Sequence, residues 1–93
     1  MLPLQNVASG VIAEILRRQP PSAARTTFAW SLAVGPALAR ATSVTLSGGV
    51  LSVRARDPRW AAEIARARDT VLPRLQQLLG KDAVTDISIL REV

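Results

Sequence analysis

Arginines are concentrated between Val53 and Arg68, and four of them have spacings that could bring them together on one surface: Arg54, Arg56, Arg59 and Arg66. A guanidinium is planar, permanently charged and able to form paired hydrogen bonds with phosphate oxygens. The whole chain of 93 residues also carries a formal net charge of +5. We therefore predict a site for a nucleic-acid backbone that binds mainly through charge.

Several residue types needed for catalysis are missing from the chain. It contains no histidine, cysteine or tyrosine, which removes the usual zinc ligands, the thiol nucleophile and the common proton shuttle at neutral pH. The seven carboxylates show no obvious acid–base pair. We expect a non-enzymatic protein with no metal and no cofactor. The preference for arginine over lysine also fits the composition bias of a GC-rich genome, but that bias does not explain the excess of basic over acidic residues.

Composition predicts a compact domain that spans residues 1–93. The hydrophobic fraction is 48% and the charged fraction 20%, values typical of globular chains. Without cysteine there is no disulfide framework. The longest uncharged run, 26–39, is too short to span a membrane. We expect a cytoplasmic protein that does not bind membranes.

Hydrophobic spacing predicts a first helix with one continuous apolar stripe, formed by Leu4, Val7, Ala8, Val11, Ile12, Ile15 and Leu16. A second helix is predicted from Ala23 and is apolar on two sides. One side carries Phe28 and Leu32, and the other carries the residues that we predict to contact a partner protein: Trp30, Val34 and Ala37.

Alternating residues predict a β-hairpin that turns at Gly48-Gly49. On its second strand, Leu51 and Val53 share one face, whereas Arg54 and Arg56 share the other. We expect the apolar face to pack on the helices and the arginine face to be exposed to solvent.

A long third helix is predicted to begin at Asp57-Pro58, with the aspartate as N-cap. Arg59 then lies in its first turn, where free N–H groups favour anions, and Arg66 extends the basic site along the helix. Arg68 falls within the apolar sector and must be paired or reach solvent. Pro73 predicts a kink or a division into two helices.

A last strand is predicted over residues 84–90, with Ile87 and Ile89 pointing inward. A strand, a helix and a strand in succession predict a parallel pair with a right-handed crossover. The resulting order is α-α-β-β-α-β, an α+β fold in which helices cover one face of a three-stranded sheet. Trp60, at the start of the long helix, is expected to cap the core.

Trp30 followed by Val34-Gly35-Pro36, and Trp60-Ala61-x-Glu63 after the hairpin, form a set that resembles the DciA family of bacterial proteins. The resemblance covers residues 4–90. It implies a K-homology-like fold of the type II order, which starts with helices. It also implies a role in loading the replicative helicase, with a DnaB-type helicase as partner and single-stranded DNA as a weakly bound ligand. The chain lacks the Gly-x-x-Gly loop with which ordinary K-homology domains hold a nucleic-acid backbone.

Two alternative functions fit the same residues. One is a protein-interaction or dimerisation module that can form a homodimer and has no intrinsic affinity for DNA. The other is an RNA- or ribosome-associated K-homology-like domain. Salt-sensitive DNA binding would argue against the first, and competition between RNA and DNA oligomers would separate the second.

Overall fold

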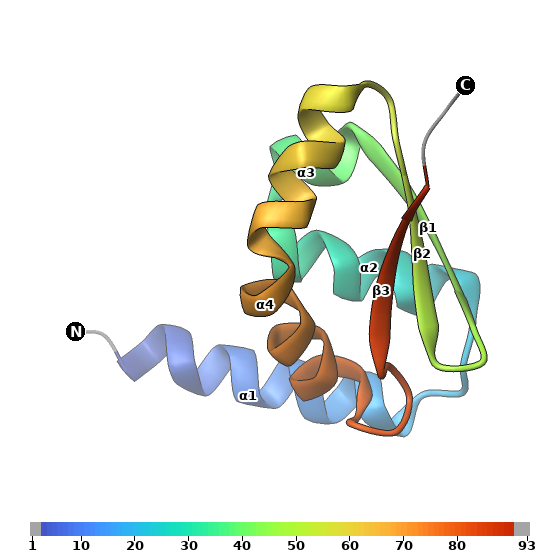
Figure 1. Cartoon of the computed structure of the whole chain (residues 1–93). Helices are drawn as coiled ribbons and strands as arrows, with labels where there is room; N and C mark the ends of the chain where they lie inside the picture. The colour runs from blue at the N-terminus through green and yellow to red at the C-terminus, as the bar shows by residue number, and fades with distance from the viewer. Residues whose placement is uncertain (1–2, 91–93) are drawn as a thin grey trace.

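The computed structural model describes the backbone of residues 3–90 and the side chains of residues 11–90. Its elements are α1 (Pro3–Arg18), α2 (Ala23–Val34), α3 (Pro36–Arg40), β1 (Thr42–Ser47), β2 (Val50–Ala55), α4 (Pro58–Leu79) and β3 (Asp86–Leu90). The helices lie on one side of a three-stranded sheet (Figure 1). The α+β class and the predicted order are confirmed, with the short helix α3 inserted before β1.

The sheet has the order β1-β2-β3, with β1 antiparallel and β3 parallel to β2. Gly48 and Gly49 form the hairpin turn with φ angles of 57° and 81°, which glycine adopts without a steric penalty. The hairpin register pairs Thr42 with Ala55 and Ser47 with Val50. The parallel pairing of β3 with β2 confirms the prediction for the last strand.

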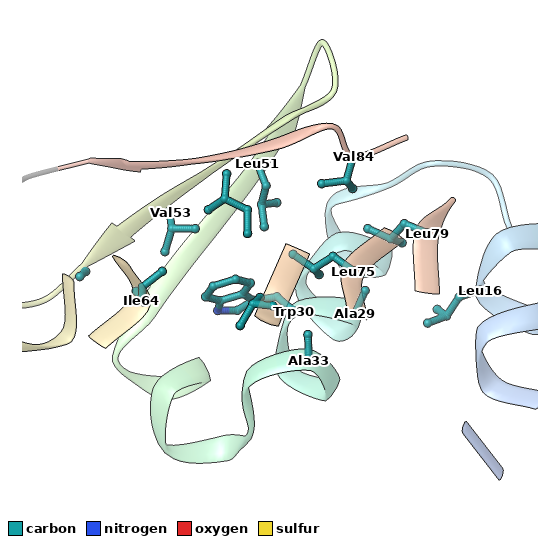
Figure 2. Close-up of a cluster of buried hydrophobic side chains, with 13 residues drawn as sticks. Leu16, Ala29, Trp30, Ala33, Leu51, Val53, Ile64, Leu75, Leu79 and Val84 are labelled. Carbon is teal, nitrogen blue, oxygen red and sulfur yellow. The ribbon is translucent and has the colours of Figure 1, made fainter. Parts of the chain in front are cut away.

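The core lies between the sheet and the helices α2 and α4. Leu51 and Val53 of β2 are fully buried, and so is Leu75 of α4. Figure 2 shows Trp30 among these side chains, beside Ile64 of α4. The alternation predicted for β2 is confirmed, because Arg54 between the buried positions is exposed.

The structure reverses the predicted orientation of α2. Trp30 is only 1% exposed and its indole N–H donates to Thr42 Oγ1 at 2.9 Å, so its side chain is not available to contact a partner directly. Phe28 and Leu32, by contrast, are 49% and 43% exposed. The reason is packing: Ala33 on the Trp30 side is also buried, and its small side chain lets α2 approach the core closely.

Helix α1 buries less of its apolar stripe than predicted. Ala13 and Leu16 are buried, but Val11 and Ile15 are more than half exposed. Figure 1 shows why: α1 meets the end of α4 with its C-terminal half, and the rest points away from the sheet. The predicted stripe residues Leu4, Val7 and Ala8 have side chains outside the described residues.

Helix α4 continues through Pro73 as one helix, so of the two alternatives predicted there, a kink or a division into two helices, the division is wrong. Pro73 is exposed, whereas Val71 and Leu75 on either side are buried. Burial of these neighbours holds the helix together despite the lost backbone hydrogen bond. Within residues 3–90, no helix combines the length and the apolar character that a membrane crossing requires.

Candidate nucleic-acid interface

Four arginines are bonded to backbone carbonyls at the ends or edges of neighbouring elements, and so hold the fold together: Arg17, Arg25, Arg68 and Arg74. Arg25 shows this role most clearly. It is buried, and its Nη1 donates to the carbonyls of Leu16 at 3.0 Å and Gln19 at 3.2 Å. Those carbonyls lie at the end of α1, where Leu16 also accepts the backbone N–H of Gln19 at 3.2 Å. Much of the chain's positive charge is therefore not free to bind a ligand.

Arg68 seals part of the outer edge of β3. Its Nε donates to the carbonyl of Ile87 at 3.2 Å, and its guanidinium pairs with the carboxylate of Asp86. Asp86 also accepts the N–H of Ile87 at 2.8 Å. These two hydrogen bonds hold the pKa of the Asp86 carboxyl below its ordinary value, with the backbone N–H as the larger cause. Of the two alternatives predicted for Arg68, pairing or reaching solvent, the structure shows pairing.

Arg54 and Arg56 remain available at the surface. Both are exposed, and within residues 11–90 neither forms an ion pair or a side-chain hydrogen bond. Arg54 lies on the face of the sheet opposite the helices. Arg56 follows β2 by one residue, and its backbone N–H donates to the carbonyl of Ala41 at 3.0 Å, which extends the hairpin pairing.

That extra hydrogen bond brings in a residue that the sequence analysis missed. Arg40 is the last residue of α3 and precedes Ala41, the residue that is opposite Arg56, and it is exposed. The hairpin register counted back from Gly48-Gly49 could have located it. We call Arg40, Arg54, Arg56 and Arg59 the basic corner; it lies where the open end of the hairpin meets the start of α4 (Figure 1).

The first turn of α4 does not offer free N–H groups to an anion, contrary to the prediction. The Asp57 carboxylate accepts the backbone N–H groups of Arg59 at 2.8 Å and Trp60 at 3.3 Å. It therefore acts as the N-cap and places a negative charge in the basic corner. The Arg59 side chain is 92% exposed and its Nε lies 3.9 Å from Asp57 Oδ1, too far for a hydrogen bond.

Arg66 lies on the same side of α4 as Arg59, because seven residues make almost two full turns. It is paired with Glu63, and both side chains are more than half exposed. Such a pair on a helix surface contributes little to stability. Arg66 can therefore exchange its carboxylate partner for a ligand at low cost.

Two hollows flank the start of α4. The first, of about 600 Å³, lies between α4 and the end of β3, and its lining includes Arg56, Ala61 and Ile89. The second, of about 640 Å³, lies on the outer side of α4 and is lined by Arg59, Trp60, Ala62, Glu63 and Arg66. Trp60 packs against the core as predicted, and it also lines this second hollow.

The face of the sheet away from the helices carries small hydroxyl side chains. The strand registers align Thr45, Ser52 and Ser88 in one row across the sheet. The next row contains Ser43 and Arg54. Hydroxyl groups are common donors to phosphate oxygens. The hydroxyl row of Thr45, Ser52 and Ser88 therefore continues the basic corner with neutral polar groups, beside the exposed Leu90, which shares a row with Arg54.

A protein-family model described as "Dna[CI] antecedent, DciA" matches residues 3–89. The match includes the whole of the basic corner, the second hollow, and the lining of the first hollow except Leu90. No curated protein matches the chain.

Proposed function

Because the chain belongs to the DciA family, whose role is helicase loading in DNA replication, we propose that it is a non-enzymatic, cytoplasmic module that binds a DnaB-type helicase and single-stranded DNA. The observation that carries the DNA part is the basic corner, where Arg54 and Arg56 are exposed and have no carboxylate partner within residues 11–90. Contacts of this kind give affinity for phosphates without reading base sequence.

The DNA proposal is tested by reversing two charges. The double variant Arg54→Glu and Arg56→Glu should weaken binding of a fluorescein-labelled single strand by about tenfold or more, because two phosphate contacts become repulsive. Fluorescence anisotropy measures the effect. The matched control is Arg18→Glu with Lys81→Glu, which changes the net charge equally near the opposite end of α4. Equal affinities for the two variants would refute the site.

The helicase part of the proposal uses exposed apolar side chains of α2 and α3, with Phe28 and Leu32 on the side of α2 opposite Trp30. Of the predicted contact residues, Ala37 is exposed and Val34 is half-buried, while Trp30 supports the surface from within. Phe28 and Leu32 add two large exposed side chains on α2. Singly exposed apolar residues are common, but neighbouring ones on a helix favour a protein contact.

A pull-down from host lysate tests this surface. Phe28→Asp with Leu32→Asp should abolish capture of the helicase, whereas Thr27→Asp on the same helix should not, because Thr27 lies outside the apolar surface. Nuclease treatment separates direct capture from capture through DNA. Helicase capture without salt-sensitive DNA affinity would favour the pure protein-interaction module, and sedimentation of the purified chain would reveal a homodimer. Preference for RNA oligomers would favour the RNA-associated alternative.

A further inference from the structure

We infer that the hollow on the outer side of α4 is a stacking site for one unpaired nucleobase, with the Trp60 ring as its floor and Arg59 and Arg66 as its phosphate contacts. This inference rests on the proposed binding of single-stranded DNA and adds the atomic basis for preferring single strands. Phosphate contacts alone would hold a duplex as well, because a duplex presents a denser phosphate charge.

The first support is the environment of the two tryptophans. Trp30 is fully enclosed and its indole N–H is bonded to Thr42. Trp60 is only partly buried, and no group within residues 11–90 accepts a hydrogen bond from its indole N–H. Trp60 lines the hollow, and its ring can supply an apolar face and an unused N–H donor, which suits a base that offers a π face and ring acceptors.

The second support is the charge around the ring. Arg59 and Arg66 both line the hollow, and their seven-residue separation places them about 10 Å apart along the helix axis. Arginine side chains are long and flexible, so guanidiniums rooted at this spacing can reach the phosphates on either side of one stacked nucleotide. Ala62, also in the lining, leaves the space above the helix backbone unobstructed.

The third feature is a built-in competitor. Glu63 lines the same hollow and pairs with Arg66, so a bound phosphate must displace this carboxylate. Replacing it with a neutral residue of the same size should free Arg66. We therefore expect Glu63→Gln to bind single-stranded DNA several-fold more tightly, a gain that a purely structural role for Arg66 would not produce.

The direct test uses tryptophan fluorescence of the unmodified protein. Because Trp30 is enclosed, a ligand that stacks on a tryptophan ring can quench only Trp60. An oligothymidine should quench part of the emission, while an abasic oligomer of the same length should bind without quenching. Trp60→Leu, which keeps an apolar side chain but removes the ring, should weaken oligothymidine binding at least about fivefold and leave abasic binding unchanged. Trp60→Phe should retain intermediate affinity.

The outcomes separate this inference from the proposal on which it rests. Salt-sensitive binding of both oligomers with equal affinity and no quenching would overturn the stacking site and leave the DNA-binding function intact. Failure of every oligomer to bind would overturn the DNA-binding function itself, and the stacking site with it. Equal quenching by oligothymidine and oligouridine would support the stacking site and assign it to unpaired bases of either sugar.

Discussion

The salt dependence of DNA binding offers a quantitative test of the basic corner. The perturbation is the neutral double variant Arg54→Gln and Arg56→Gln, which removes charge without adding repulsion. Each phosphate that a protein neutralises on a single strand contributes about 0.7 to the slope of log affinity against log salt concentration. The four arginines of the corner and Arg66 therefore predict a slope of about −3.5, and the variant, with three of these five left, a slope of about −2.1.

These slopes predict effects that are easily distinguished. Between about 50 and 200 mM salt, the unmodified protein should lose about 130-fold in affinity, but the variant only about 18-fold. Anisotropy titrations at four salt concentrations with one labelled oligothymidine measure both slopes. The structure supplies a matched control in Arg18→Gln with Lys81→Gln, because α4 has 22 residues and separates the two ends by about 33 Å. That separation exceeds the Debye length of about 8 Å.

Parallel slopes for the unmodified protein and the corner variant would refute the reasoning, even if the variant bound more weakly. They would mean that Arg54 and Arg56 affect binding without displacing counterions, and that the phosphates lie elsewhere on the molecule. A shallower slope for the control variant would have the same meaning and would point to the C-terminal ends of α1 and α4.

Three further predictions concern the fold. Leu75→Ala should lower the free energy of unfolding by about 2–5 kcal/mol, measured by urea denaturation, because Leu75 is fully buried; a loss below 1 kcal/mol on that scale would mean that the core is loosely packed. Asp86→Asn should destabilise the protein near neutral pH. The difference in unfolding free energy between variant and unmodified protein should disappear as the pH falls through the lowered folded-state pKa of Asp86, since the carboxyl group stabilises the fold only while it is ionised. Denaturation at several pH values checks this, and a difference that persists in acid would contradict it. Gly49→Ala should lower the melting temperature more than Gly48→Ala, because both have positive φ but only the Gly49 Cβ would lie 3.0 Å from Thr85 Oγ1; equal melting temperatures would show that Thr85 moves aside.

Local patterns were sufficient to predict the sheet. Alternation on either side of Gly48-Gly49 fixed the hairpin, and Leu51, Val53 and Arg54 face the sides expected of them. Period-two spacing is decisive here because a shift of one residue would bury Arg54. The parallel placement of β3 followed from the chirality of strand–helix–strand crossovers.

The wrong predictions for α2 and α1 concern which side of each helix packs against the rest of the protein, and local patterns do not determine this. Both sides of α2 are apolar, so periodicity could not decide that Trp30 is buried and Phe28 exposed; the Thr42 hydroxyl that accepts the indole N–H is distant in sequence. Likewise, nothing in the stripe of α1 shows that α4 ends before it can cover Val11.

The candidate site was predicted in part. Arg54 and Arg56 are exposed as expected, and Arg59 stands in the first turn of α4. Arg40 was missed because its place depends on one hydrogen bond beyond the end of the strand. The capped state of the first turn could have been anticipated, since an aspartate N-cap consumes the same N–H groups that an anion would use.

The contacts of Arg68 at β3 also bear on how copies of this protein behave when crowded together. An outer strand with bare amide groups invites another chain to add to the sheet, and such addition can repeat into fibres. Here both backbone groups of Ile87 are already occupied, the carbonyl by Arg68 and the N–H by Asp86. A strand of another molecule that paired with Ile87 would first have to displace the Arg68–Asp86 ion pair. Arg68 thus opposes the addition of further strands at Ile87, a role that does not depend on any ligand.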